Sequence, residues 1–383
     1  MPQVTIVQRV LPHYRIPFFV GLHDCLAAAG IRLRLIYGQE FPGTVPQTCC
    51  LPEPWAQQII NKYLRFPGVE LVWQPCLDSI SGSDLVVVEQ ANRYLVNYLL
   101  HLKRRRRLLK LAYFGHGRNM QSARPECFRE RFKKLFLDKI DWWFAYTELT
   151  RTLVAASGFP AERITVVQNT IEISEGNGQT GAVRQLDLST LRAELGLVGD
   201  NVAVYCGGMH ADKRLDFLLN SCLELRKLLP DFEMLFIGSG PEQRKVEQAA
   251  RSYSWIHYAG PRFEDRVPYL KLGKALLMPG LVGLVIVDSF SVEVPLITTS
   301  IPVHSPEIAY LENGINGIMT TNNLESYVSS VYSYLRSPEQ QRHLREGCRR
   351  SARLYSTENM IANFAEGIKR CLDSEFKGKN TIV

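Results

Sequence analysis

The sequence predicts an α/β protein that has a parallel sheet in each of two domains. In the first half, strand-like apolar segments alternate with segments of helical length, which is the pattern of βαβ units. In the second half, the segments 202–216, 236–241 and 277–288 each combine a short apolar strand, a turn that contains glycine and the start of a helix. The length of 383 residues also favours two domains, because an ordinary domain has about 150 residues.

Short apolar runs predict the strands, and the longer segments between them predict the helices. The expected strands of the first half are 4–8, 32–37, 84–89, 109–114, 142–146 and 164–170, and the expected helices include 18–29 and 95–100. Residues 173–186 are polar, rich in glycine and without period, so they predict a linker or a surface loop. We then expect a helix at 188–195, the first strand of the second domain at 202, and a last helix that begins after Ser356 as a possible N-cap.

The three strand-turn-helix junctions predict a site for an anion. They place several helix N-termini at the carboxyl edge of a parallel sheet, where backbone amides and helix dipoles favour a group such as a diphosphate. Lys213 follows the first of these turns. Its ammonium is expected to contact a diphosphate as a point charge; the alternative is a solvent-exposed helix lysine.

The order of these motifs resembles the donor-binding domain of the retaining glycosyltransferases of family 4. That family reads G-R-L-x-x-x-K at the first turn, and this chain has Gly207–Lys213 there. The family's G-x-G-P matches Gly238–Pro241, and its P-E segment followed by N-G is similar to 301–317. The resemblance implies the GT-B architecture, in which two Rossmann-like αβα domains face a central cleft.

The resemblance also assigns a role to each part of the chain. Residues 1–172 would form the N-terminal Rossmann-like domain on the acceptor side, and 173–200 the linker. Residues 201–355 would bind the nucleotide-sugar donor, and 356–383 would form a C-terminal helix that crosses back to the N-terminal domain.

Two positions depart from the family pattern. Gly208 stands where the family has an arginine, and Arg214 is a poor substitute for it because neighbouring helical residues point in different directions. In the family's E-x7-E pair, the first position falls on Gly280 and the second on Asp288. We interpret the chain as a divergent branch that handles the sugar differently; the alternative is a weakened enzyme.

The turns and the resemblance together define the candidate site. His116 lies in Gly-His-Gly-Arg after a first-domain strand, where family members often place a histidine close to the donor sugar. The expected catalytic residues are His116, Lys213 and Asp288. The expected donor-binding residues are Gly207, Gly208, Lys213, Gly238, Gly283, Leu284 and Asp288. The expected acceptor-side residues are His13, Arg15 and Arg118.

Composition limits the partners and the compartment. The net charge of +7 permits anionic partners without selecting one. The basic blocks 103–107 and 129–139 are interpreted as solvated helix faces or as a docking face for anionic lipid, and no recognition motif supports nucleic acid. Nine cysteines without C-x-x-C spacing favour reduced thiols. We expect no signal peptide and no membrane-spanning segment. The expected location is the cytoplasm, and peripheral contact with the inner face of the membrane is the alternative kept open.

The resemblance to family 4 therefore implies a retaining glycosyltransferase of the hexosyltransferase type. It would move a sugar from a UDP or GDP sugar to the hydroxyl of a glycan or a lipid-linked saccharide in cell-envelope polysaccharide synthesis, without a cofactor and without a metal. Two rivals stay open: a nucleotide-sugar epimerase of GT-B fold, and a non-catalytic glycosyltransferase-like binding subunit.

Overall fold

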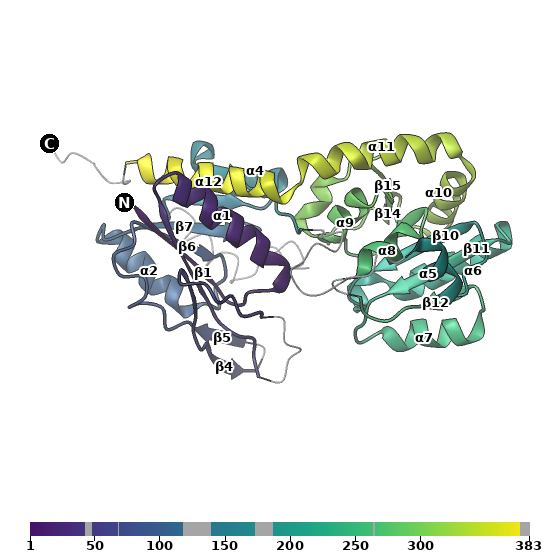
Figure 1. Ribbon diagram of the computed structural model, residues 1–383, viewed down its shortest axis with the longest axis horizontal. Coiled ribbons are helices and arrows are strands. Elements are labelled where there is room, and N and C mark those ends of the chain that lie inside the picture. Colours follow the sequence, from purple (N-terminus) through teal and green to yellow (C-terminus); the bar gives the residue numbers. More distant parts are fainter. Residues whose placement is uncertain (43–47, 68, 118–138, 173–186, 263–264, 376–383) are drawn as a thin grey trace. The chain divides into compact units, whose positions relative to one another are not determined.

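The computed structural model describes residues 1–42, 48–67, 69–117, 139–172, 187–262 and 265–375. The chain divides into two compact units, each with its own parallel sheet (Figure 1). The first unit combines Met1–Glu172 with Ser356–Val383, and the second is Ile173–Tyr355. We call them the first and the second domain.

The main sheet of the first domain has seven parallel strands in the order β3-β2-β1-β6-β7-β8-β9. Their bounds are Gln3–Gln8 (β1), Arg32–Tyr37 (β2), Ala56–Gln58 (β3), Leu85–Glu89 (β6), Lys110–Gly115 (β7), Trp142–Ala145 (β8) and Ile164–Val166 (β9). Every residue of β7 and β8 is buried. This is typical of parallel strands that are covered on both faces.

Helices cover both faces of this sheet, and they are α1 (Ile16–Ala28), α2 (Leu95–Arg105), α4 (Glu148–Ala156) and α12 (Thr357–Asp373). Because successive strand residues point to opposite faces, Ile6 lies in one core with α1 and α12 and Val7 lies in the other with α2 and α4. Figure 1 shows α1 and α12 side by side on the first of these faces.

Close contacts join α12, the last helix of the chain, to the first domain. Phe364 stacks on Phe144 with ring centroids 4.2 Å apart. A Cβ at Gly367 would lie 2.7 Å from the Phe144 ring, so glycine permits this approach. At the other end of the helix, the buried ammonium of Lys110 donates to the carbonyl oxygens of Cys371 and Leu372 at 2.7 and 2.6 Å. This cation satisfies the C-terminal carbonyls and opposes the negative end of the helix dipole.

A hairpin that the sequence analysis did not predict extends from the first domain. It consists of β4 (Lys62–Phe66) and β5 (Val69–Trp73), which pair antiparallel. Helix α2 packs against β5.

The sheet of the second domain has six parallel strands in the order β12-β11-β10-β13-β14-β15. Their bounds are Asn201–Cys206 (β10), Phe232–Ile237 (β11), Ile256–Tyr258 (β12), Ala275–Leu277 (β13), Leu296–Thr299 (β14) and Gly317–Thr320 (β15). The helices are α5 (Leu188–Glu194), α6 (Leu215–Leu228), α7 (Gln243–Ser252), α8 (Arg266–Lys271), α9 (Val285–Ser291), α10 (Leu324–Arg336) and α11 (Pro338–Leu354). Strands β10, β11, β13 and β14 are buried throughout.

The strands and helices predicted from the sequence are present, with shifted boundaries. The strand expected at 164–170 ends at Val166, and the helix expected at 95–100 continues to Arg105. Ser356 is the N-cap of the last helix, because its side chain accepts a hydrogen bond from the amide of Asn359. Within the described residues, no helix combines the length and the apolar character that crossing a bilayer would require.

Candidate functional site

The centre of the second sheet marks the expected position of a ligand. Strand order reverses between β10 and β13, which are neighbours in the sheet although β11 and β12 lie between them in the chain. In doubly wound sheets, ligands bind at the carboxyl ends of the strands at such a switch point. Residues 207–214 follow β10 and residues 278–284 follow β13. Both loops contain glycines that were predicted to bind the donor.

The glycine turns after β10 and β11 pack directly against each other. Gly207 donates its amide to the oxygen of Ile237 at 3.0 Å. A Cβ at Gly238 would lie 1.9 Å from the oxygen of Gly207, and a Cβ at Gly240 would lie 2.6 Å from that of Met209. Backbone atoms cannot yield at such distances, so these turns require glycine for their close approach.

This packing narrows the set of amides that can meet a phosphate. The amide of Gly207 is used within the protein, and the amide of Gly238 donates to the oxygen of Gly260 at 2.9 Å. The amides of Gly208, Gly283 and Leu284 have no acceptor among the described residues. Of the five backbone positions expected to bind the donor, these three keep a donor group for a ligand.

Lys213 lies in the loop between β10 and α6. It ends a short 3-10 turn, and Arg214 then takes a left-handed conformation with φ 58° before α6 begins. The Lys213 ammonium donates to the oxygen of Leu281 at 2.5 Å, which ties this loop to the loop after β13. Burial lowers the pKa of Lys213, although the charge of Asp212 acts in the opposite sense. An ammonium has three donors, and Leu281 is its only hydrogen-bond acceptor among the described residues.

Gly280, which the sequence analysis aligned with the first glutamate of the family 4 pair, lies against this same loop. A Cβ at Gly280 would come within 2.3 Å of the Asp212 oxygen and 2.5 Å of the Lys213 oxygen. The amide of Leu281 donates to the Asp212 oxygen at 2.9 Å. The absence of a side chain at Gly280 therefore brings the lysine loop against the loop after β13.

Arg214 holds the same two loops together. Its guanidinium donates to the oxygen of Pro279 at 3.2 Å and to Oγ1 of Thr299 at 3.1 Å. It also donates to Oδ1 of Asn322 at 2.7 Å and lies over the Phe217 ring. These contacts commit the Arg214 guanidinium to the protein itself.

His304 is a site residue that the sequence analysis did not identify. Its Nδ1 accepts from the amide of Val282 at 3.1 Å, and its Nε2 donates to the oxygen of Thr299 at 2.8 Å. These partners require the neutral ring with the proton on Nε2. Burial lowers the pKa of His304, and the charge of Lys213 lowers it further. The His304 ring thus holds the loop after β13 through its two hydrogen bonds. Because the ring is neutral, Lys213 remains the charged group that would attract an anion.

Asp288 has a partner that the sequence did not indicate. Its Oδ1 accepts from Nε and Nη2 of Arg266, at 2.9 and 2.7 Å. The carboxyl group is buried, which raises its pKa, while the guanidinium acts in the opposite sense. Cys206 is the last residue of β10. The pKa of its thiol is raised to about 12, mainly by burial and to a smaller extent by the charge of Asp288. The ion pair of Asp288 and Arg266 therefore lies near the end of β10, where the glycine turn begins.

In the first domain, His116 is exposed directly after β7. Its ring meets the ring of Tyr146 edge-on, with centroids 4.3 Å apart. Gly117 follows with φ 76°, a left-handed value that favours glycine, and its oxygen accepts from Nε2 of Gln90 at 3.1 Å. The turn therefore holds the histidine at the carboxyl edge of the first sheet.

The three acceptor-side residues differ in their placement. Arg15 is 8% exposed, and its guanidinium donates to Oδ1 of Asn169 and to the oxygen of Thr170. These contacts hold the loop after β1, and the acceptor-side role of Arg15 stays a prediction. His13 lies in the same 3-10 turn and is partly exposed. Arg118 lies outside the described residues.

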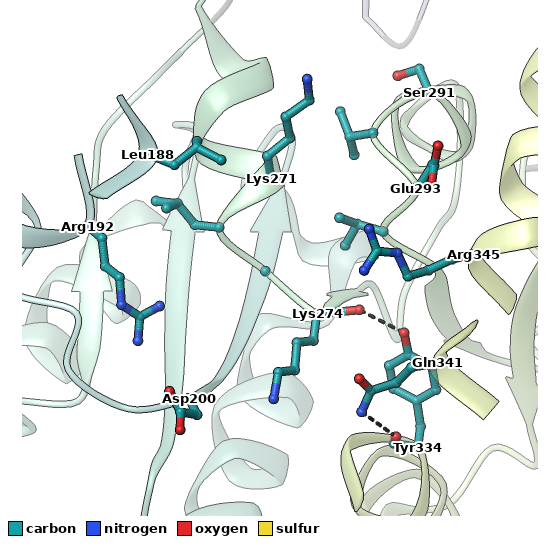
Figure 2. Close-up of a pocket in the computed structure, with 14 residues that line it drawn as sticks. Leu188, Arg192, Asp200, Lys271, Lys274, Ser291, Glu293, Tyr334, Gln341 and Arg345 are labelled. Atoms are coloured by element: carbon teal, nitrogen blue, oxygen red, sulfur yellow. Dashed lines mark hydrogen bonds between the residues drawn. The ribbon is translucent and has the colours of Figure 1, made fainter. Parts of the chain in front are cut away.

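A cavity of about 530 Å³ lies in the second domain away from the glycine turns. Figure 2 shows Arg192, Lys271, Lys274 and Arg345 around it. It opens near the C-terminal ends of α8 and α9, where cations oppose the negative ends of helix dipoles. Lys274 donates to Oδ1 of Asn201 at 3.1 Å. This cavity lies away from the switch point of the sheet, so we assign the candidate site to the glycine turns.

Three further findings concern metal binding and similarity to known proteins. Within the part of the chain that the structure describes, no group of three or more His, Cys, Asp or Glu side chains is arranged to hold a metal ion. No curated protein matches this chain. Residues 200–337 match the family of glycosyl transferases group 1.

Solved structures are similar to the whole chain. HepE of Anabaena in complex with UDP has a TM-score of 0.69 at 13% identity, covering 96% of this chain and 100% of that chain. Sucrose-phosphate synthase of Thermosynechococcus elongatus has a TM-score of 0.67 at 13% identity, covering 96% and 98%. A putative UDP-N-acetylglucosamine 2-epimerase of Listeria monocytogenes has a TM-score of 0.63 at 13% identity, covering 96% and 95%. At these identities the likeness shows the fold, and it confirms the predicted GT-B class with two Rossmann-like halves.

Proposed function

We propose that this protein is a retaining glycosyltransferase of family 4. It moves a sugar from a nucleotide-diphosphate sugar, with UDP or GDP as the nucleotide, to the hydroxyl of a glycan or lipid-linked saccharide of cell-envelope polysaccharide synthesis. The match of residues 200–337 to glycosyl transferases group 1 supports the reaction class. The complex of the similar HepE structure with UDP-glucose supports the donor class.

The environment of Lys213 carries the proposal. The ammonium is partly buried at the switch point of the second sheet, and no carboxylate among the described residues forms an ion pair with it. His304, which the Lys213 charge reaches, is neutral, because its Nδ1 accepts a hydrogen bond from Val282 and its Nε2 donates one to Thr299. A partly buried cation that no described carboxylate contacts directly, on a loop that also carries the amide of Gly208, is suited to an anion such as a diphosphate.

These residues would act on the leaving group. As the bond between the sugar and the diphosphate breaks, negative charge grows on the phosphate oxygens. The Lys213 ammonium and the turn amides stabilise that charge without rearranging, because the loops around them are fixed by Gly280 and Arg214. His116 would act from the first domain on the sugar, and Asp288 on the ribose of the donor.

Calorimetric titration with UDP, GDP and uridine tests the donor site. We expect Lys213→Ala to weaken binding of the diphosphate by about tenfold to a hundredfold, since a charge-assisted hydrogen bond contributes roughly 1.5 to 3 kcal/mol. Uridine affinity should change little. Lys227→Ala, on an exposed lysine of α6, is the matched control. An equal loss of affinity for UDP and uridine would remove the phosphate role.

Product analysis separates the proposal from its rivals. Purified protein is incubated with UDP or GDP sugars, with and without saccharide acceptors, and the products are followed by NMR. A retaining transferase gives a glycoside with the donor's anomeric configuration, only when an acceptor is present. Conversion of the donor sugar without an acceptor would indicate an epimerase. Binding without any turnover would indicate a non-catalytic subunit.

We also propose peripheral contact with the anionic inner face of the membrane, since the acceptor class includes lipid-linked saccharides. The C-terminal end of α2 supports this. Arg105, Arg106 and Arg107 are exposed there, and so are Leu102 and Leu108. Cations beside exposed apolar side chains favour anionic lipid headgroups.

A further inference from the structure

The hairpin β4–β5 carries apolar side chains on both of its faces. Its register places Leu64 opposite Leu71 and Phe66 opposite Val69. Because successive strand residues point to opposite faces, these four share one face, which we call the outer face. Val72 lies on the other, inner face and is fully buried.

The inner face accounts for the attachment of the hairpin to its domain. The Tyr63 hydroxyl donates to the oxygen of Gln39 at 2.5 Å. The Arg65 guanidinium lies 3.3 Å from the centroid of the Phe41 ring. Nε of Arg65 donates to the Glu70 carboxylate at 3.1 Å. On the outer face, Trp73 at the end of β5 packs against the core that contains Val7, whereas Leu64, Phe66 and Val69 are exposed.

The outer face presents large apolar side chains to solvent. Leu64, Phe66 and Val69 are 49%, 58% and 38% exposed, and Ile60, two residues before the strand, is 77% exposed. These four are among fifteen exposed large hydrophobic side chains of the described residues, and they fall within ten positions. An antiparallel pair that packs on one face is ordinarily polar on the other. An exposed apolar cluster of this kind marks a binding surface.

One cation lies on this apolar face, and two more lie beside Glu70 of the inner face. Lys62 shares the outer face and lies opposite Trp73. Arg93 is 44% exposed and lies 3.8 Å from Glu70, which also pairs with Arg65. One carboxylate is thus shared by two guanidinium groups, and Lys62 adds a third positive charge.

We propose that the outer face of the hairpin docks onto an anionic lipid bilayer. Ile60, Leu64, Phe66 and Val69 would enter the boundary between headgroups and acyl chains, and Lys62 would reach the lipid phosphates. A long cationic side chain can bury its stem while its charge stays at the headgroups.

The charges disfavour a second copy of the chain as the occupant. A twofold contact would bring the same cations of two copies together. Lys62 and Arg65 also lie on β4, which has no partner strand other than β5 in the described sheets. Cations on such an edge strand oppose pairing with another strand. An anionic bilayer satisfies both the apolar and the cationic part of the surface.

Vesicle flotation of the full-length protein tests this inference. Neutral phosphatidylcholine vesicles are compared with vesicles that contain roughly 30% phosphatidylglycerol, and we expect binding to the anionic vesicles that weakens as salt rises. The double variant Leu64→Ser/Phe66→Ser should lower the partition coefficient at least about tenfold. Val198→Ser/Leu228→Ser, on side chains 87% and 52% exposed in the second domain, is the matched control and should bind as the wild type does.

Three outcomes would overturn the inference. The first is that the wild type floats with neither kind of vesicle. The second is that the hairpin variant floats as well as the control variant. The third is that sedimentation velocity shows a dimer of the wild type that the hairpin variant abolishes. The inference extends the proposed function to a surface of the first domain, and its readout does not require turnover. UDP affinity of the hairpin variant should equal that of the wild type, so loss of vesicle binding and loss of the donor site are distinguishable.

Discussion

Replacing Gly280 with alanine should destabilise the second domain and weaken its diphosphate site. The added Cβ would stand 2.3 Å from the oxygen of Asp212 and 2.5 Å from that of Lys213. Both are backbone atoms, so the lysine loop must move away from the loop after β13. Overpacking of this kind costs about 1 to 3 kcal/mol, and the same shift separates the Lys213 ammonium from Leu281.

Gly283→Ala is the matched control, because its Cβ would lie 3.7 Å from Oγ of Ser305, an ordinary contact. Thermal unfolding followed by circular dichroism measures the difference. For a unit of this size, 1 kcal/mol corresponds to about 2 to 4 °C in Tm, so Gly280→Ala should lower Tm by about 2 to 12 °C. UDP affinity should fall with it.

The result that refutes this reasoning is a Gly280→Ala protein with the Tm and the UDP affinity of Gly283→Ala. The close approach of the two loops would then not depend on glycine. A Gly280→Glu variant that gains turnover would further show that the chain is a weakened enzyme and not a divergent one.

Three further predictions address the remaining groups. Asp288→Ala should cost at most roughly 3 to 5 kcal/mol of stability, because it removes the buried carboxylate from its ion pair with Arg266, whereas Asp288→Asn should cost less; a double-mutant cycle in urea measures the coupling, and additive effects would contradict it. His116→Ala should lower kcat at least about tenfold, or roughly 1.4 kcal/mol, with little change in donor Kd; full kcat with a lower Tm would show a structural role. Burial lowers the pKa of His101 from 6.5 to about 4. Between these two pH values the unfolded chain binds a proton at His101 and the folded chain does not, so the free energy of unfolding should fall by about 3 kcal/mol as pH drops from 6.5 to 4. His101→Phe should reduce this pH dependence, and an unchanged dependence would contradict the assignment to His101.

The fold class was predictable because its signals are local. Apolar runs mark the buried parallel strands, and glycines mark the turns that follow β10, β11 and β13. The contacts that shape the site are not local. Gly280 meets Lys213 across 67 positions and His304 meets Val282 across 22, and no pattern in a single sequence indicates which residues will come together.

Other features gave misleading or weak signals. Arg15 was predicted to lie on the acceptor side, and nothing in the sequence indicates that its guanidinium is buried against Asn169 and Thr170. Asp288 was interpreted through the family pattern, which contains no information about Arg266. The hairpin was missed although Leu64-Arg65-Phe66 and Val69-Glu70-Leu71 alternate, because these strands are short and lie outside the parallel βαβ pattern on which the strand predictions rested.

The attachment of α12 to the first domain has a consequence for synthesis of the chain. The core that contains Phe18 and Phe144 also contains Phe364, so it cannot close until the last helix leaves the ribosome. The 183 residues from Ile173 to Tyr355 are made in between, which takes about 10 to 40 s at roughly 5 to 20 residues per second. During that interval the first domain has an open apolar face while the second domain is already able to fold. The nascent first domain is therefore the part of this protein most in need of a chaperone.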